Sequence, residues 1–254
     1  MLKKFLVAAL AAVCGLAAAA VVYANPASDT THEVNVNASP KNSGTSRSPK
    51  SEKLSVSIDG GTKSGTGQPE TTDKVTIRTP FKYRGTAWPT RSRCDDAAAN
   101  LQKTNARCPR PSRVGSGRAD LLAANGAIKR SLILTIHVVR GTETNPRRTQ
   151  RGSLGIWARS ANATDVPQIN QFIPGTTRGG TITFDIPPNL EQPLGVKSAI
   201  DKITASFGGS ITVSGEKVGV LESTRCSKRR WPFAITFDTF TGNLTDTDSV
   251  SCRP

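Results

Sequence analysis

Short runs of alternating apolar and polar residues, separated by turn sequences, recur along most of this chain. In residues 31–40 (THEVNVNASP) Val34 and Val36 share one face, and residues 53–61 (KLSVSIDGG) repeat the pattern. A period of two is typical of a β-strand with one buried face. About ten to twelve such runs, bounded by turn residues, are typical of a sandwich or a closed barrel.

No helical pattern alternates with these runs, which disfavours an α/β fold. We therefore expect an all-β fold, a mostly antiparallel β-sandwich that forms a single domain over residues 31–254. Residues 132–139 (LILTIHVV) are apolar on both faces and predict a central strand. The histidine in this strand, His137, is expected to be a core residue rather than a general base.

The N-terminus has the features of a secretory signal. Lys3 and Lys4 precede an apolar run from about Phe5 to Val22, and Ala24 suits a cleavage site. We expect a signal peptide at residues 1–24, followed by a short polar lead at 25–30. The alternative is an uncleaved anchor, because a run of about 18 residues is near the lower limit for a membrane span. After cleavage we expect no membrane span and a secreted or cell-envelope location.

Cleavage would leave four cysteines, which are Cys94, Cys108, Cys226 and Cys252. An even number in an exported chain suggests two disulfides, although three pairings are possible. We prefer the local pairs, Cys94–Cys108 and Cys226–Cys252. They would close loops of about 15 and 27 residues and stabilise the fold by roughly 3 and 3.5 kcal/mol.

The segment between the first two cysteines (CDDAAANLQKTNARC) is the one convincing helix pattern. Asp95 and Asp96 suit a first helical turn, where the helix dipole favours negative charge. We therefore expect one short helix whose ends are held together by the Cys94–Cys108 disulfide.

The chain is strongly basic, with 34 Lys and Arg against 19 Asp and Glu and a net charge of +15. Loss of Lys3 and Lys4 with the signal would reduce this to +13 (15 − 2). Such a charge favours anionic partners, although it also serves solubility alone. The candidate anion-binding residues form two groups, which are Arg147, Arg148 and Arg151, and Lys228, Arg229 and Arg230.

Arginine suits phosphate and carboxylate recognition because its planar guanidinium donates in a fork. A specific nucleic-acid site usually interleaves aromatic residues with the basic ones. Aromatic residues make up only 5% of this chain, and most of them fall at core-like positions. We therefore expect an anionic cell-wall or surface polymer as partner and no specific nucleic acid.

The sequence gives little support for a metal site or for a catalytic nucleophile. The chain has only two histidines, His32 and His137, and no C-x-x-C step, so neither a metal site nor a cofactor is expected. Ser116 and Ser153 do not lie in a G-x-S-x-G elbow. Asp246 and Asp248 would allow a calcium site, but a polar edge strand is the favoured interpretation.

Glycoside hydrolysis would need two carboxylates that flank a cleft. The candidate acids, Asp185, Asp238, Glu216 and Glu222, form no recognisable array in the sequence. We therefore expect a protein that is not an enzyme.

The stretch CPRPSRVGSGRAD (108–120), with its upstream cysteine, resembles a group of uncharacterised secreted actinobacterial proteins. These carry a cysteine, a short helix, a CP-x-x-S-x-VGSG turn and a terminal hairpin that ends in V-x-C-R. The matching positions are Cys94, Cys108, Pro109, Ser112, Val114, Gly115, Ser116, Gly117, Val250, Cys252 and Arg253. The resemblance implies a disulfide-bearing β-sandwich and brings no established activity and no catalytic residues.

These observations together predict an exported, non-catalytic structural or binding protein that interacts electrostatically with anionic surface polymers. One alternative is a carbohydrate-binding module, which would stack sugars on Trp88, Trp157 or Trp231. The other is a glycan-active enzyme on the same scaffold. The glycines of VGSG are expected to be turn residues and not a phosphate loop, because a hairpin and not a helix follows them. The oligomeric state is left open.

Overall fold

The computed structural model describes residues 29–95, 108–140, 153–192, 196–240 and 242–254. The fold is all-β, as predicted. The strands are β1 (Thr30–Ser39), β2 (Lys50–Thr62), β3 (Thr72–Arg78), β4 (Lys82–Tyr83), β5 (Cys94–Asp95), β6 (Arg113–Ala123), β7 (Ile128–Arg140), β8 (Ser153–Ser160), β9 (Asn170–Arg178), β10 (Thr181–Asp185), β11 (Ser198–Gly208), β12 (Ser210–Val213), β13 (Glu216–Gly219), β14 (Leu221–Ser223), β15 (Arg230–Thr239) and β16 (Gly242–Ser251).

The helical segments of the described residues are short. They are the four-residue α2 (Pro188–Glu191) and the 3₁₀ turns η2 (Gly85–Ala87), η3 (Thr90–Ser92), η4 (Arg110–Ser112) and η5 (Ser227–Arg229). The helix predicted between Cys94 and Cys108 falls on residues 96–107, which lie outside the described residues, as does the predicted signal peptide. Within the described ranges, no helix is long and apolar enough to cross a membrane.

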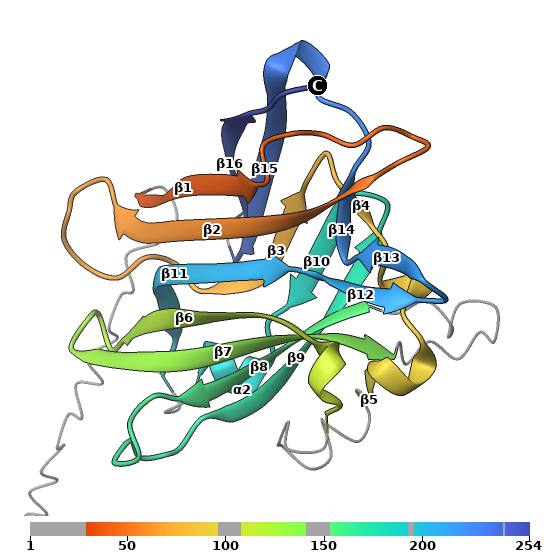
Figure 1. Ribbon diagram of the computed structural model, residues 1–254. Coiled ribbons are helices and arrows are strands. Elements are labelled where there is room, and N and C mark those ends of the chain that lie inside the picture. The colour runs from red at the N-terminus through yellow and green to blue at the C-terminus, as the bar shows by residue number, and fades with distance from the viewer. Residues whose placement is uncertain (1–28, 96–107, 141–152, 193–195, 241) are drawn as a thin grey trace, which may run out of the picture.

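Two facing layers are built from one continuous sheet (Figure 1). The first layer runs β1-β2-β11-β6-β7-β8, and the second runs β10-β3-β15-β16. Every pairing among them is antiparallel. In the described part of the chain the short β5 pairs in parallel with β7, and Asn42 and Arg253 form an isolated parallel bridge. β12 and β13 form a separate small hairpin, and β14 and β4 extend the sheet beyond β2.

β9 carries the sheet from one layer to the other. Residues 170–174 pair with β8, whereas residues 175–178 pair with β10. The change of partner falls between Pro174 and Gly175. Pro174 donates no ladder hydrogen bond, and a Cβ on Gly175 would lie 2.6 Å from the Phe184 ring and 2.7 Å from the Leu154 carbonyl oxygen. This Pro-Gly pair therefore suits the corner of the fold, where the two layers approach closely.

At the opposite side, the two end strands of the sheet meet without forming a ladder. The backbone N–H of Val34 on β1 donates to Asp246 Oδ2 on β16 at 2.8 Å, and the N–H of Val36 donates to Asp248 Oδ2 at 2.6 Å. We call these two contacts the seam. The carboxylates take the place of strand carbonyls, so the seam satisfies edge donors that would otherwise be open to another chain. These are the residues considered above for calcium, and here each accepts a backbone hydrogen bond.

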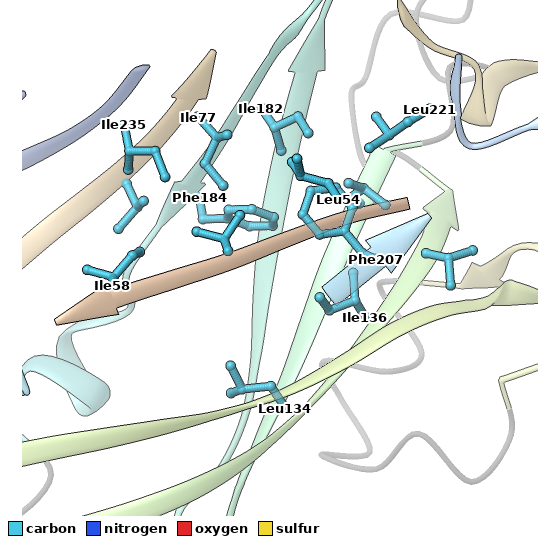
Figure 2. Packing of buried hydrophobic residues seen from close by; sticks show 14 of the residues in the cluster. Leu54, Ile58, Ile77, Leu134, Ile136, Ile182, Phe184, Phe207, Leu221 and Ile235 are labelled. Carbon is cyan, nitrogen blue, oxygen red and sulfur yellow. The ribbon is translucent and has the colours of Figure 1, made fainter. Parts of the chain in front are cut away.

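The main core fills the space between the layers (Figure 2). Leu54, Ile58, Leu134 and Phe207 come from the first layer, and Ile77, Ile182, Phe184 and Ile235 come from the second. β7 is buried on both faces over residues 137–139, where Val139 packs in a second, smaller cluster with Cys94, Trp157 and Phe172. The prediction of two buried faces is confirmed only there, because Ile133 and Thr135 on the second face are half-buried.

Candidate functional site

Both predicted disulfides are present in the structure. Cys94–Cys108 joins Cα atoms 4.7 Å apart, and Cys226–Cys252 joins Cα atoms 5.9 Å apart. The second disulfide closes the open end of the β15–β16 hairpin, where Arg230 pairs with Ser251.

Three separate chain segments meet beside the Cys226–Cys252 disulfide. The N–H of Cys252 donates to the carbonyl of Arg229 at 3.0 Å, and the N–H of Arg253 donates to the carbonyl of Lys41 at 2.7 Å. The indole Nε1 of Trp231 donates to the carbonyl of Arg225 at 2.9 Å. The basic residues of these segments are all exposed, and we call them the cationic cluster: Lys41, Arg225, Lys228, Arg229, Arg230 and Arg253.

The backbone holds part of this cluster in an unfavourable conformation. Lys228 and Arg229 have φ values of 54° and 56°, in the left-handed region that side-chain-bearing residues rarely adopt. Such residues cost on the order of 1 kcal/mol each and persist where the surrounding structure fixes them. The disulfide and the Cys252–Arg229 hydrogen bond supply that constraint. The Lys-Arg-Arg sequence shows the charges but carries no sign of this geometry.

Within the described part of the chain, the cationic cluster makes no ion pair. Arg230 Nη1 donates to the neutral Ser249 hydroxyl at 2.8 Å. On neighbouring β14, Glu222 is already engaged by Arg84 at 3.5 Å. Burial raises the pKa of Glu52 on β2 to about 7, so this carboxyl is only partly ionised near neutral pH. The positive charge of the cluster therefore lacks local compensation.

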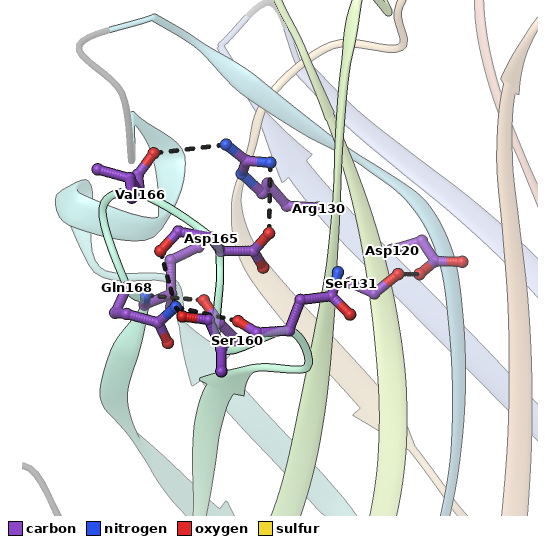
Figure 3. Close-up of polar contacts among 10 residues, drawn as sticks. Asp120, Arg130, Ser131, Ser160, Asp165, Val166 and Gln168 are labelled. Atoms are coloured by element: carbon purple, nitrogen blue, oxygen red, sulfur yellow. Dashed lines mark hydrogen bonds and ion pairs between the residues drawn. The ribbon is translucent and has the colours of Figure 1, made fainter.

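Some charges elsewhere are paired, as the polar network near the β6–β7 turn shows (Figure 3). Arg130 Nη1 lies 3.4 Å from Asp165 Oδ1, and its Nη2 donates to the Val166 carbonyl. Asp120 accepts from Ser131 at 2.5 Å and lies 3.8 Å from Lys129 Nζ. Other exposed basic residues of the described strands, such as Arg118, Arg159 and Arg178, also make no ion pair there. The gathering of six basic side chains at one end of the fold is what makes the cationic cluster a surface for an external anion.

The other predicted basic group, Arg147, Arg148 and Arg151, lies outside the described residues. The structure therefore assigns geometry to only one of the two candidate groups, Lys228, Arg229 and Arg230. It adds Lys41, Arg225 and Arg253 to that group. Lys41 is distant in sequence, and the contacts of its segment with Arg253 and Ser223 bring it to this end.

A polar groove of about 550 Å³ lies between β2, β6 and β11. Its lining includes the VGS part of the VGSG motif and three basic residues, Lys53, Arg113 and Lys217. The glycines of the motif are not turn residues, because Gly115 and Gly117 lie within β6 and pair with β11. A Cβ on Gly117 would lie 2.5 Å from the Thr204 carbonyl oxygen, so close strand contact explains glycine here. No helix follows the motif, which fits the expectation that it is not a phosphate loop.

The acids do not converge in this groove. Glu52 is the one carboxylate among the described residues that line it. Asp185 and Asp238 both lie 3.7 Å from Lys74 Nζ, and Glu216 is exposed on β13. A glycosidase needs a second carboxylate across the cleft, and the lining of this groove does not supply it.

His137 is 4% exposed, and its Nδ1 lies 2.9 Å from the Ser112 hydroxyl. That hydroxyl donates to the Pro109 carbonyl at 2.6 Å, so the shared hydrogen bond to His137 comes from Nδ1–H. Desolvation, with a smaller contribution from Arg113, lowers the pKa of His137 to about 4. Ser112 is fully buried and its proton faces a carbonyl, so this pair supports the core as expected for His137.

The tryptophans offer no platform for a sugar. Trp88, Trp157 and Trp231 are 2%, 3% and 1% exposed. A carbohydrate-binding module stacks sugars on exposed aromatic rings. The sequence alternative that relied on these three residues therefore loses its site.

Among the described residues, no three His, Cys, Asp or Glu side chains gather closely enough to hold a metal ion. Comparisons with protein-family models, with curated proteins and with solved structures find no match to this chain.

Proposed function

We propose that this chain is an exported, non-catalytic binding protein that holds an anionic surface polymer, such as a polyphosphate-type wall polymer, on its cationic cluster. The observation that carries the proposal is the gathering of six exposed basic side chains from three segments, none in an ion pair within the described residues. Two disulfides support an oxidising, extracytoplasmic compartment.

Attraction of this kind should act over a distance and be screened by salt. The Debye length is about 8 Å at physiological ionic strength, so exposed charges further apart than that hardly cooperate. The backbone contacts that join Arg253 to Lys41 and Cys252 to Arg229 keep the basic residues of the cluster together. A flexible polyanion, whose phosphates can take up more than one spacing, therefore suits a cluster whose basic residues come from three segments.

The test is a titration of the protein with fluorescently labelled polyphosphate at salt concentrations from about 20 to 500 mM, which span the screening range. For a flexible strand, the logarithm of the affinity falls with the logarithm of salt by about 0.7 per phosphate contact. Six contacts give a slope of about −4, and three contacts give about −2.

The variant is Lys228→Gln/Arg229→Gln/Arg230→Gln. Its matched control, Arg118→Gln/Arg159→Gln/Arg178→Gln, removes three charges from exposed strand positions outside the cluster. We expect the Lys228→Gln/Arg229→Gln/Arg230→Gln variant to halve the slope of log affinity against log salt concentration. The control variant should keep most of that slope. Equal effects of the two variants would mean that net charge alone attracts the polymer. Affinity that does not change with salt, or tighter binding to neutral dextran, would contradict the proposal.

A further inference from the structure

A cavity of about 120 Å³ lies between the two layers, away from the cationic cluster. Its walls come from β2, β6, β7, β8 and β11 on one side and from β3 and β10 on the other. Ile136 and Phe184, labelled in Figure 2, belong to its almost entirely apolar lining. An apolar cavity of about 150 Å³ in a protein core stays dry and binds benzene. This space therefore suits one small ring or a molecule of similar size.

One hydroxyl in the lining lacks a hydrogen bond. Thr72, the first residue of β3, is 3% exposed, and its Oγ1 has no partner among the described residues. The neighbouring hydroxyl of Ser198 is used, because it donates to the carbonyl of Leu190 at 2.7 Å. A buried hydroxyl without a partner costs stability unless a bound molecule supplies one. A ligand in this cavity could therefore place a single polar group beside Thr72 Oγ1 and hydrogen-bond it.

The acidic residues near this end disfavour an anionic ligand. Glu191 on α2 also lines the cavity, and desolvation together with Asp73 raises its pKa. Lys197 acts in the opposite direction on that carboxyl. A water molecule needs two to four polar partners, so the apolar body of the cavity would not hold one.

We propose that this cavity binds an uncharged molecule of about the size of benzene, which carries one hydroxyl group that hydrogen-bonds Thr72 Oγ1. The apolar body of the ligand fills the space between the layers, against Ile136 and Phe184. The site is separate from the cationic cluster, so both can be occupied at once.

The experiment uses ¹⁹F NMR of two probes, 4-fluorophenol and fluorobenzene, with the native protein and three variants. Thr72→Val removes the hydroxyl at constant shape. Its control, Thr76→Val, makes the same change on the outer face of β3, where Thr76 Oγ1 lies 3.4 Å from Thr183 Oγ1. Ala158→Leu fills the cavity from a fully buried position. Ala119→Val fills it from β6 and replaces Ala158→Leu if that variant does not fold.

We expect both probes to bind the native protein, with 4-fluorophenol preferred about fivefold because of one added hydrogen bond. Thr72→Val should remove the preference, Thr76→Val should keep it, and the cavity-filling variant should bind neither probe. The proposal is overturned if neither probe binds the native protein, if binding survives in the filled variant, or if the preference survives in Thr72→Val. Binding to the cationic cluster has its own readout, so either proposal can fail alone.

Discussion

Glu52 gives this fold a pH dependence that one substitution should remove. The residue is 1% exposed, its Oε1 accepts from the Ser223 hydroxyl at 2.6 Å, and its Oε2 has no partner among the described residues. Burial raises its pKa from 4.5 to about 7. The folded state therefore binds this proton more tightly than the unfolded state does.

The sign of the effect follows from linkage. Below about pH 4.5 the carboxyl is protonated in both states, and its contribution to stability is fully present. As the pH rises toward 7, the unfolded state loses the proton first and the folded state loses stability. A shift from 4.5 to about 7 corresponds to about 3 kcal/mol at 1.36 kcal/mol for each pKa unit.

Glu52→Gln keeps the oxygen that accepts from Ser223 and cannot ionise. We expect its free energy of unfolding to match that of the native protein near pH 4.5 and to exceed it by about 3 kcal/mol near pH 8. Urea unfolding at the two pH values measures this difference, and subtraction of the native values cancels the titration of other groups. Glu216→Gln on exposed β13 is the control. A Glu52→Gln difference that is the same at both pH values would refute the reasoning.

Three further changes test other contacts by urea unfolding. Asp246→Ala/Asp248→Ala should lower the free energy of unfolding by about 3 kcal/mol, because the seam loses two charged hydrogen bonds. Cys226→Ser/Cys252→Ser should lower it by about 3.5 kcal/mol, the chain-entropy effect of a loop of about 27 residues. Gly117→Ala should lower it by about 1–3 kcal/mol, because the new Cβ would lie 2.5 Å from a carbonyl oxygen of β11.

Each of these has a matched control. The Asp246→Asn/Asp248→Asn variant keeps neutral acceptors at the seam and should lose less stability than the Ala variant. Treatment of the native protein with a reductant should lower its free energy of unfolding by at least as much as the Cys226→Ser/Cys252→Ser change does. Gly61→Ala places a Cβ at ordinary contact distance, 3.5 Å from the Thr31 hydroxyl, and should be nearly neutral. Stability unchanged by the Asp→Ala changes would show that the seam does not hold the sheet edges together.

The alternation of residues predicted much of the fold, because one buried face is a property of the strand itself. β1, β2 and β7 follow directly from their sequences, although the second face of β7 is fully buried only at residues 137–139. The disulfide pairs were also predictable, since the four cysteines fall into two pairs that are close in sequence. The seam was not predictable from the sequence. Asp246 and Asp248 have the pattern of solvent-facing residues on an edge strand, and only the folded structure shows β1 beside them.

The candidate site was predictable only in part. Lys228, Arg229 and Arg230 are visible as a charge run, but Lys41 and Arg253 join them only through tertiary contacts. The role of Gly117 was misread as a turn because Gly-Ser-Gly is usually one, and the close approach of β11 leaves no trace in local sequence. Thr72 became notable only when the structure showed a buried hydroxyl without a partner in the described residues.

The seam also sets when this protein can finish folding as it is made. Val34 and Asp246 are 212 residues apart, so the first strand has no closing partner until nearly the whole chain has been synthesised. Until then β1 exposes donors that any passing strand can use. Contacts of such long sequence separation form slowly. A chain crossing a membrane from its N-terminus would therefore remain incomplete through most of its passage, and a truncation that removes only the last strand would leave the first one open as well.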